Sequence, residues 1–314
     1  MDRKADASRE LAGAITKAAS KQTYYTIRYL ADRERVGDAY RAYAYFRWVD
    51  DIIDEDTGDP VEAAAFIERQ ASLLQACYRG EIPADLSREE CMLLDLVRND
   101  NEENSGLRAY LFNMMEVMRF DAGRRGQVIS HAELCSYTRH LAVAVTEAMH
   151  YFIGHDNPTP PHEARYLAVT AAHITHMLRD AQEDVQAGYF NIPREVLQSS
   201  GISPREMGTQ AYREWVRSRV QLARGYFEAG RDCIARVRCL RCRLAGYAYT
   251  ARFEWMLRTI ERDGYHLRPA YPERKSLLAG LWMGCRVLVA MLALPCCQSA
   301  VPRLAVQPLR SEER

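Results

Sequence analysis

Two acidic clusters in the chain have residue types and a spacing that suit metal-assisted diphosphate chemistry. They are Asp50-Asp51-Ile52-Ile53-Asp54 and Asp180-Ala181-Gln182-Glu183-Asp184, and each follows closely on an arginine, Arg47 or Arg179. Residues four apart in an α-helix share one face, about 6 Å apart along the axis. The two outer aspartates of each cluster should therefore project together.

Mg2+ is the cation that such a pair of clusters suits. It takes octahedral oxygen coordination, keeps several waters and is usually bound by one or two carboxylates together with substrate phosphates. Two facing helices would place walls of carboxylates on either side of a diphosphate. The pairing is typical of a trinuclear Mg2+ site that holds a diphosphate.

A solvated helix face is the ordinary alternative for an acidic run. The first cluster, however, is embedded in apolar sequence, at residues 42–46, 48–49 and 52–53. Such flanks predict a buried helix, where carboxylates are costly unless they are paired or metal-bound. Metal binding is therefore favoured over a solvated face.

Composition excludes some other function classes. Lys+Arg and Asp+Glu both total 42 in 314 residues, so the formal net charge is zero and no nucleic-acid partner is expected. The N-terminus is polar and charged and lacks the apolar core of a signal peptide, and the nine cysteines are scattered. We therefore expect a cytoplasmic protein with reduced thiols.

The pattern between Ser8 and Ala300 is helical, and no stretch shows sustained strand alternation. The breaks that contain glycine or proline are short and read as loops. This predicts an all-α fold with about a dozen helices in one domain, residues 1–314, which ends in an apolar C-terminal helix and tail, residues 276–314.

The stretch from Ser276 to Cys297 is apolar and is interrupted only by Arg286. A membrane-spanning helix needs about 20 mostly apolar residues, and an arginine in its middle costs about 2.5 to 3.5 kcal/mol. We therefore predict a terminal helix that packs on the body and whose apolar face could contact a membrane, in preference to true insertion.

With these residues in place, the chain resembles the squalene/phytoene synthase family over nearly its whole length. The matching stretches are Ser20-Lys21 with Tyr24, Tyr43 to Asp54, Tyr137 with Leu141-Ala142, Leu178 to Asp184 with Gly188 and Pro193, and Tyr249 to Tyr265. The resemblance implies an all-α isoprenoid-synthase fold, a helical bundle around a central cavity. It also implies Mg2+ dependence and ionisation of an allylic prenyl diphosphate to a carbocation.

The resemblance also implies roles for individual residues. The metal ligands, direct or through water, would be Asp50, Asp51, Asp54, Asp180 and Asp184, and the diphosphate ligands would be Lys21, Arg47 and Arg179. Arginine suits the second role because its planar fork donates two parallel hydrogen bonds to phosphate oxygens. Tyr43 and Tyr137 stand where the family places tyrosines against the diphosphate or the cation, although each could equally be a core tyrosine.

The sequence departs from the family pattern in its catalytic half. Gln22-Thr23 replace a serine and a phenylalanine, and the segment 141–146 carries larger side chains at two positions where glycines let a second prenyl chain pass. His173 and His176 stand in place of a glutamine and an asparagine, and Tyr189 in place of an arginine.

His173, His176 and Asp180 share one helix face at i, i+3 and i+7, so both histidines should point toward the cavity. One could act as a general base, since its unperturbed pKa suits proton removal near neutrality. Both could instead be hydrogen-bonded replacements for the amides. A zinc site built from these three residues is a weaker alternative, because the spacing matches no strong motif.

These departures favour the hypothesis that the acceptor is an aromatic ring, as in phytoene-synthase-like bacterial enzymes that prenylate carbazoles, with a short allylic donor. The alternative is the usual head-to-head condensation of two C15 or C20 prenyl diphosphates. The apolar C-terminus fits that alternative somewhat better. A non-catalytic subunit that retains the fold is a third reading, and the intact acidic motifs argue against it.

Overall fold

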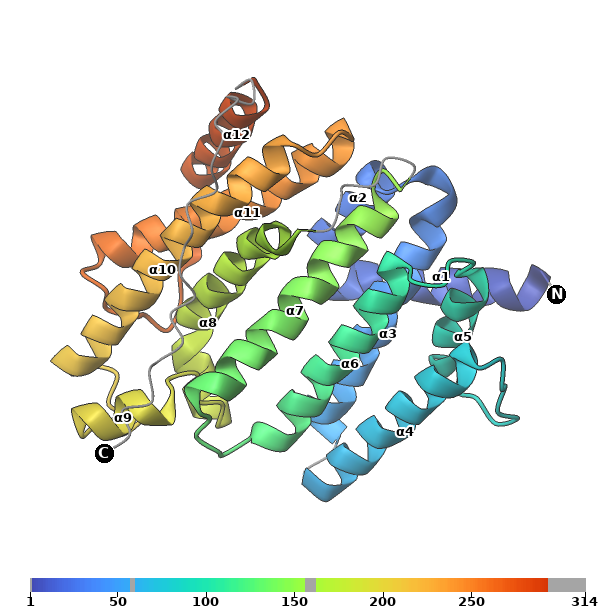
Figure 1. The fold of residues 1–314 in the computed structure, drawn as a ribbon, viewed down its shortest axis with the longest axis horizontal. Coiled ribbons are helices and arrows are strands. Elements are labelled where there is room, and N and C mark those ends of the chain that lie inside the picture. Colours follow the sequence, from blue (N-terminus) through green and yellow to red (C-terminus); the bar gives the residue numbers. More distant parts are fainter. Residues whose placement is uncertain (1, 57–59, 156–161, 293–314) are drawn as a thin grey trace.

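The computed structural model describes residues 2–56, 60–155 and 162–292. Within these ranges it contains twelve α-helices and no β-strand, and the only β contact is an isolated bridge between Val128 and Phe190 (Figure 1). The predicted all-α fold is confirmed. The tail beyond residue 292 lies outside the described residues.

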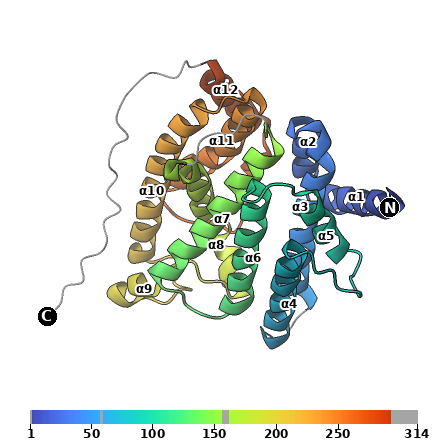
Figure 2. The same ribbon diagram turned by 45° about the vertical axis from the view of Figure 1, so that its right-hand side comes forward.

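The helices follow one another with short connections. They are α1 (Asp2–Ala19), α2 (Lys21–Leu30), α3 (Val36–Asp51), α4 (Pro60–Tyr78), α5 (Glu90–Asn99), α6 (Gly106–Arg124), α7 (His131–Phe152), α8 (Leu167–Ala187), α9 (Arg194–Ser200), α10 (Gln210–Ala235), α11 (Leu240–Arg262) and α12 (Leu277–Leu292). A π-helical turn, Ile52–Asp56, extends α3. The N-terminal helices gather on one side, and α8 to α12 form the other (Figure 2).

Two local signals position the elements around the second acidic cluster. Ser130 and Glu133 form a capping box that begins α7, with the Ser130 side chain accepting from the Glu133 amide. Gly188 ends α8 at φ 91°, a left-handed conformation that favours glycine. Its carbonyl accepts from the Gly126 amide at 2.8 Å. This bond joins the loop after α6 to the loop after α8.

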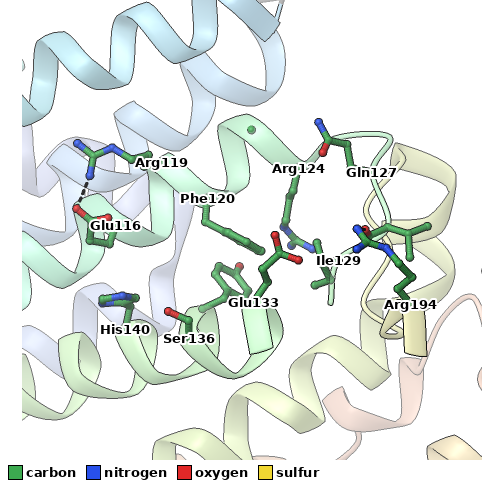
Figure 3. Close-up of a pocket in the computed structure, with 13 residues that line it drawn as sticks. Glu116, Arg119, Phe120, Arg124, Gln127, Ile129, Glu133, Ser136, His140 and Arg194 are labelled. Carbon is green, nitrogen blue, oxygen red and sulfur yellow. Dashed lines mark hydrogen bonds and ion pairs between the residues drawn. The ribbon is translucent and has the colours of Figure 1, made fainter. Parts of the chain in front are cut away.

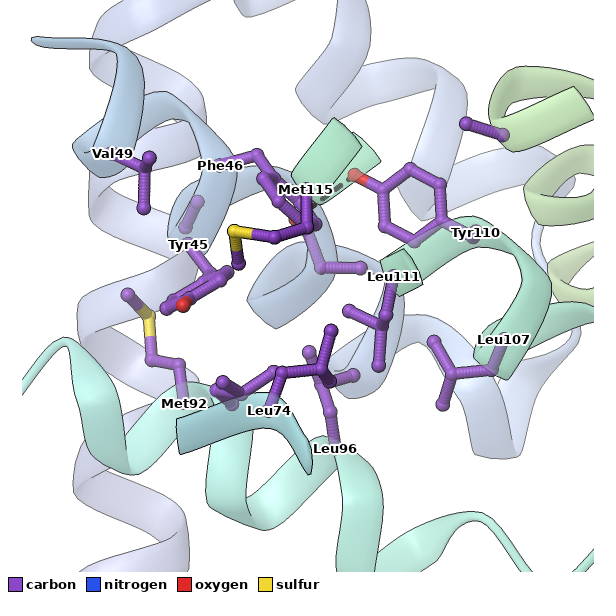
Figure 4. Close-up of a cluster of buried hydrophobic side chains, with 14 of the residues drawn as sticks. Tyr45, Phe46, Val49, Leu74, Met92, Leu96, Leu107, Tyr110, Leu111 and Met115 are labelled. Atoms are coloured by element: carbon purple, nitrogen blue, oxygen red, sulfur yellow. Dashed lines mark hydrogen bonds between the residues drawn. The ribbon is translucent and has the colours of Figure 1, made fainter. Parts of the chain in front are cut away.

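The hydrophobic core behind the first cluster fixes α3 (Figure 4). Tyr45 is fully buried and donates from its hydroxyl to Gln70 Oε1 at 3.0 Å. Tyr110 of α6 donates to the Ala42 carbonyl at 3.1 Å. Their aromatic rings pack with Phe46 in edge contacts. The core therefore holds α3 against α6 with every buried hydroxyl of this pair satisfied.

Helix α10 offers a matched pair of glycines for a stability test. A Cβ on Gly230 would lie 2.7 Å from the backbone nitrogen of Ala168, whereas a Cβ on Gly225 would meet nothing within 4 Å. We expect Gly230→Ala to lower the free energy of unfolding by about 2 kcal/mol or more because the helices must separate. Gly225→Ala should raise it by about 0.5 to 1 kcal/mol. Urea unfolding of both variants checks this; equal stabilities would contradict the close packing of α10 on α8.

Asp32 joins three parts of the chain before α3. Its carboxylate is buried. Oδ2 accepts hydrogen bonds from the backbone amides of Gly154 and His155, both at 2.9 Å. Oδ1 pairs with the Arg241 guanidinium at 2.6 Å. Burial alone would raise the pKa of Asp32, but these bonds outweigh it, so the pKa lies below the usual 3.8. The ionised form therefore stabilises the fold.

We expect Asp32→Asn to cost about 2 kcal/mol of unfolding free energy at neutral pH. A carboxyl with a lowered folded pKa contributes above its unfolded pKa, and the contribution fades as pH falls below it. The difference in unfolding free energy between wild type and variant should therefore persist as the pH falls to 3.8, the ordinary pKa of an aspartate, and should narrow below that pH. Denaturant unfolding at neutral and more acidic pH measures the gap; a constant gap would show that the charge is not responsible.

Candidate active site

The first acidic cluster lies where α3 passes into the π-helical turn. Asp50 and Asp51 are 38% and 40% exposed and both pair with Arg47, while Asp54 is exposed. The apolar flanks do lie on a largely buried helix, but Asp50 and Asp51 lie at its partly exposed side and are half-buried, not enclosed in the core as the flanks suggest. The wider turn, a feature often found at functional sites, re-aims Asp54 relative to a regular α-helix.

The second cluster lies at the C-terminal end of α8. Asp180 pairs with Arg179 and with His176, whose Nε2 lies 2.9 Å from its carboxylate. Asp184 accepts from Asn191 Nδ2 at 2.7 Å. The turn at Gly188 brings Asn191 back beside α8, so the loop as well as the helix holds this cluster.

The structure brings the two clusters to one region. Tyr189 donates from its hydroxyl to Asp54 Oδ1 at 3.3 Å, a direct link from the loop after α8 to the turn after α3. Burial is the main cause that raises the pKa of Asp50, followed by the charge of Asp54, and the charge of Asp121 on α6 adds to it. The turn after α3 and the loop after α8, far apart in the sequence, therefore lie next to each other.

Three residues in this region were not predicted. Asp121 accepts from Arg124 Nε at 2.7 Å and from the Tyr137 hydroxyl at 3.0 Å. Arg124 is 8% exposed and also donates to Asn191 Oδ1 at 2.8 Å. Hydrogen bonds thus lead from Asp184 of the second cluster through Asn191 and Arg124 to Asp121. The charge of Asp121 in turn acts on Asp50 of the first cluster. Asp121 and Arg124 are three residues apart on α6, a spacing typical of many surface ion pairs, so the sequence carried no strong signal.

Repulsion between neighbouring carboxylates marks the region, although arginines pair with several of them. Burial and repulsion from Asp54 raise the pKa of Asp50 to about 6. Burial and repulsion from Asp180 raise the pKa of Asp184 to about 7. Divalent cations would relieve this repulsion, and carboxylate oxygens are the ligands that Mg2+ prefers. The donor set therefore fits the predicted metal.

The same carboxylates do not form a complete metal site by themselves. In the part of the chain that the structure describes, no three His, Cys, Asp or Glu side chains could hold one ion together. This is compatible with Mg2+, which completes its coordination with water and substrate phosphates. It gives no support to the zinc alternative at His173, His176 and Asp180.

The structure brings two of the three predicted diphosphate ligands to the acidic region. Arg47 and Arg179 pair with the two clusters. Lys21 is exposed at the first position of α2, next to Gln22, which accepts from Arg252 of α11 at 3.2 Å. Lys21 thus lies where α2 meets α11, and its side chain has no acidic partner within the described ranges.

The comparisons with known proteins fit this geometry. Residues 16–278 match the family model for squalene/phytoene synthase. The chain belongs to the squalene/phytoene synthase family. It is 25% identical over 283 residues to presqualene diphosphate synthase of Zymomonas mobilis, covering 88% of this chain and 92% of that protein. It is 24% identical over 271 residues to phytoene synthase 3 of Zea mays, covering 82% of this chain and 61% of that protein.

Solved structures of this family share the fold. The squalene synthase HpnC of Alicyclobacillus acidocaldarius superposes with a TM-score of 0.67 at 20% identity, over 85% of this chain and 98% of that one. A dehydrosqualene synthase in complex with a ligand gives a TM-score of 0.65 at 19% identity, over 92% and 96%. The isoprenoid-synthase-type helical fold is therefore confirmed.

The two tyrosines that the family resemblance singles out have different environments. Tyr43 is half-buried, one turn before Arg47 on α3, and burial raises its pKa. Tyr137 is buried, and burial, with the charge of Asp121 next, holds its pKa well above the usual value, so it stays protonated. Its ring lies 4.9 Å from the Arg124 guanidinium. Tyr137 therefore acts as a hydrogen-bond donor to Asp121.

The two histidines do not share one environment, although they share a helix. His176 is 49% exposed and bonded to Asp180. His173 is 5% exposed, its ring lies 5.0 Å from the Tyr137 ring, and neither ring nitrogen has a hydrogen-bond partner among the described residues. Burial, helped by the charge of His176, lowers the pKa of His173 to about 3. His173 is therefore neutral at physiological pH and can both donate and accept.

A pocket of about 370 Å³ opens between α6 and α7 (Figure 3). Phe120 and Arg124 on α6 and Glu133, Ser136 and His140 on α7 contribute to its walls. Tyr137 also lines it, whereas none of the five motif aspartates does. Arg124 and Tyr137, which both bond Asp121, therefore also contribute to the wall of this pocket.

Proposed function

We propose that this protein is a Mg2+-dependent prenyltransferase that ionises an allylic prenyl diphosphate and joins two prenyl diphosphates head to head. The observation that carries the proposal is the convergence of both acidic clusters, with the pKa of Asp50 raised to about 6 and that of Asp184 to about 7. Such repulsion is costly unless cations bind there.

Each proposed residue has a defined task. Asp50, Asp51 and Asp54 on one side and Asp180 and Asp184 on the other would hold the Mg2+ ions, directly or through water. When bound, the metal supplies Lewis-acid stabilisation of the departing diphosphate. Lys21, Arg47 and Arg179 would exchange their present surroundings for phosphate oxygens and so orient the leaving group.

The two proposed tyrosines would place aromatic rings near the carbocation. Tyr137, held by Asp121 and beside the Arg124 guanidinium, keeps its proton and presents a fixed aromatic ring next to Phe120 at 4.9 Å. Aromatic faces tolerate a nearby carbocation because their quadrupole attracts positive charge. Tyr43, one turn before Arg47 on α3, would be the second aromatic ring near the cation.

A second prenyl diphosphate is the acceptor that the comparisons support better. The presqualene diphosphate synthase match covers nearly the whole of both chains. The two histidines give little support to an aromatic acceptor, whose reaction needs a base to remove the ring proton. His173 is a weak base at a pKa of about 3, and His176 is already bonded to Asp180. Head-to-head coupling is therefore our primary proposal, in place of the aromatic transfer that the sequence departures favoured.

Transfer to an aromatic ring, such as a carbazole or an indole, is the second candidate. It is favoured by two side chains on α7 that are larger than the family's glycines. At the two positions where the family resemblance places glycines, Val143 is half-buried and Thr146 is buried with its hydroxyl unpartnered. These side chains occupy volume along the helix that a second prenyl chain would follow. A short donor with a compact acceptor would need less room.

Product analysis separates the two candidates. The protein is incubated with Mg2+ and dimethylallyl, geranyl, farnesyl or geranylgeranyl diphosphate, each alone and with indole or carbazole, and products are identified by mass spectrometry. We expect a product formed from two C15 or two C20 units without any added acceptor. A prenyl mass added to the aromatic compound, with no coupled product, would replace our primary proposal by the second.

A further inference from the structure

Helix α12 carries an apolar face that no described segment covers. Six of its large apolar side chains are between 60% and 88% exposed. These six residues, which we call the leucine face, are Leu277, Leu278, Leu281, Leu288, Val289 and Leu292. Their spacing places them along one side of the helix, and elsewhere in the described chain only five other large apolar side chains are exposed. A patch this concentrated marks an interaction surface.

The opposite side of α12 fixes it on α11. Trp282 packs against Trp255 with ring centroids 5.5 Å apart, and Ala279 is fully buried. Arg286 donates to Glu254 at 3.0 Å, and Glu254 is itself 6% exposed. Figures 1 and 2 both show α12 on the outer edge of the molecule, against α11. The leucine face is therefore held outward in a defined orientation.

The packing of α12 favours a helix that lies against the body. Its sixteen described residues, Leu277–Leu292, extend about 24 Å. No helix in the described part of the chain has the length and apolar character that crossing a membrane requires. The Arg286–Glu254 pair further ties α12 flat against the body.

The charges around the face are complementary to anionic lipid. Leu277–Leu292 contains no acidic residue. Arg274 and Lys275 are exposed just before its first leucine, and Arg258 is exposed beside Trp282, 5.0 Å from that ring. Leucines flanked by exposed cations are typical of helices that lie in the membrane interface.

We propose that the leucine face of α12 binds the surface of an anionic lipid bilayer, with the helix lying in the plane of the membrane. The inference uses only α12 and its surroundings and does not depend on the reaction that the protein catalyses. Burial of the six side chains in the headgroup region would supply the affinity, and the exposed cations would make it depend on anionic lipid and on salt.

Vesicle flotation of the full chain tests the proposal. We expect wild type to float with vesicles that contain phosphatidylglycerol, less with pure phosphatidylcholine, and less at high salt. The double variant Leu281→Gln, Leu288→Gln should lower partitioning onto anionic vesicles about tenfold or more. Ile82→Gln is the matched control, at a 54% exposed apolar residue between α4 and α5, and should bind like wild type.

Three results would overturn the proposal. The first is wild-type protein that binds neither kind of vesicle. The second is a double variant that floats as well as wild type. The third is a wild type that forms a dimer in analytical ultracentrifugation, ignores vesicles, and becomes monomeric in the double variant, which would make the face a surface between two copies.

Discussion

The Asp184→Asn variant is expected to release pyrophosphate from its prenyl diphosphate about 10² to 10³ times more slowly than wild type at saturating Mg2+. The carboxylate would be one of few metal ligands at the end of α8, and an amide oxygen carries no charge to offset that of a divalent cation. Its pKa, raised to about 7, shows that the negative charge is unfavourable without a cation.

The same variant should be at least as stable as wild type above pH 7, because it removes a repelled charge. Lost turnover together with retained thermal stability separates a metal role from a folding defect. Glu183→Gln is the matched control, since Glu183 is the exposed neighbour on the same helix, and it should keep nearly full activity. Wild-type turnover in Asp184→Asn would contradict the role assigned to the second cluster.

Arg124→Gln should lower the free energy of unfolding by about 3 kcal/mol, the second large effect that we expect. Arg124 is 8% exposed and bonds both Asp121 and Asn191, so its loss leaves mostly buried partners unsatisfied. Burial already raises the pKa of Asp121, against the opposing effect of Arg124. Without that guanidinium, the Asp121 carboxyl should become harder still to ionise.

Urea unfolding measures the effect, and Arg119→Gln provides the comparison. Arg119 lies on the same helix but is 37% exposed and pairs with the exposed Glu68 and Glu116. Its removal should cost less than about 1 kcal/mol. If both variants lost the same small amount of unfolding free energy, the bonds of Arg124 to Asp121 and Asn191 would not hold the buried network together.

Much of the architecture could be predicted because it depends on periodic patterns and strong motifs. Helical spacing through nearly the whole chain predicts an all-α fold, and two Arg-then-acidic segments predict a shared site. The outcome for the C-terminal helix is similar: its apolar pattern and single arginine predict a helix packed on the body, and Arg286 does pair with Glu254.

The remainder depends on tertiary contacts that no local pattern encodes. Asp121 and Arg124 look like an ordinary surface pair until folding brings Tyr137 and Asn191 against them. The π-helical turn at Ile52–Asp56 leaves no mark in a sequence that also suits a regular helix. Tyr189 reads as a lost arginine, yet its hydroxyl reaches Asp54.

The histidines show the same limit. Their spacing on α8 predicts a shared face, but packing buries His173 against Tyr137 and leaves His176 half exposed beside Asp180. Burial then lowers the pKa of His173, which no sequence pattern reveals. Family membership is likewise visible from the motifs, whereas the acceptor depends on how the side chains of α7 fill space.

The most direct test of the central claim is pyrophosphate release by the wild-type protein from farnesyl or geranylgeranyl diphosphate, measured while Mg2+ is titrated into protein freed of metal with a chelator. We predict no release without Mg2+ and a rise to saturation as Mg2+ is added, lost again in Asp184→Asn. Release that is unchanged by the chelator, or that is retained in that variant, would contradict ionisation of a prenyl diphosphate by metal ions held between the two acidic clusters.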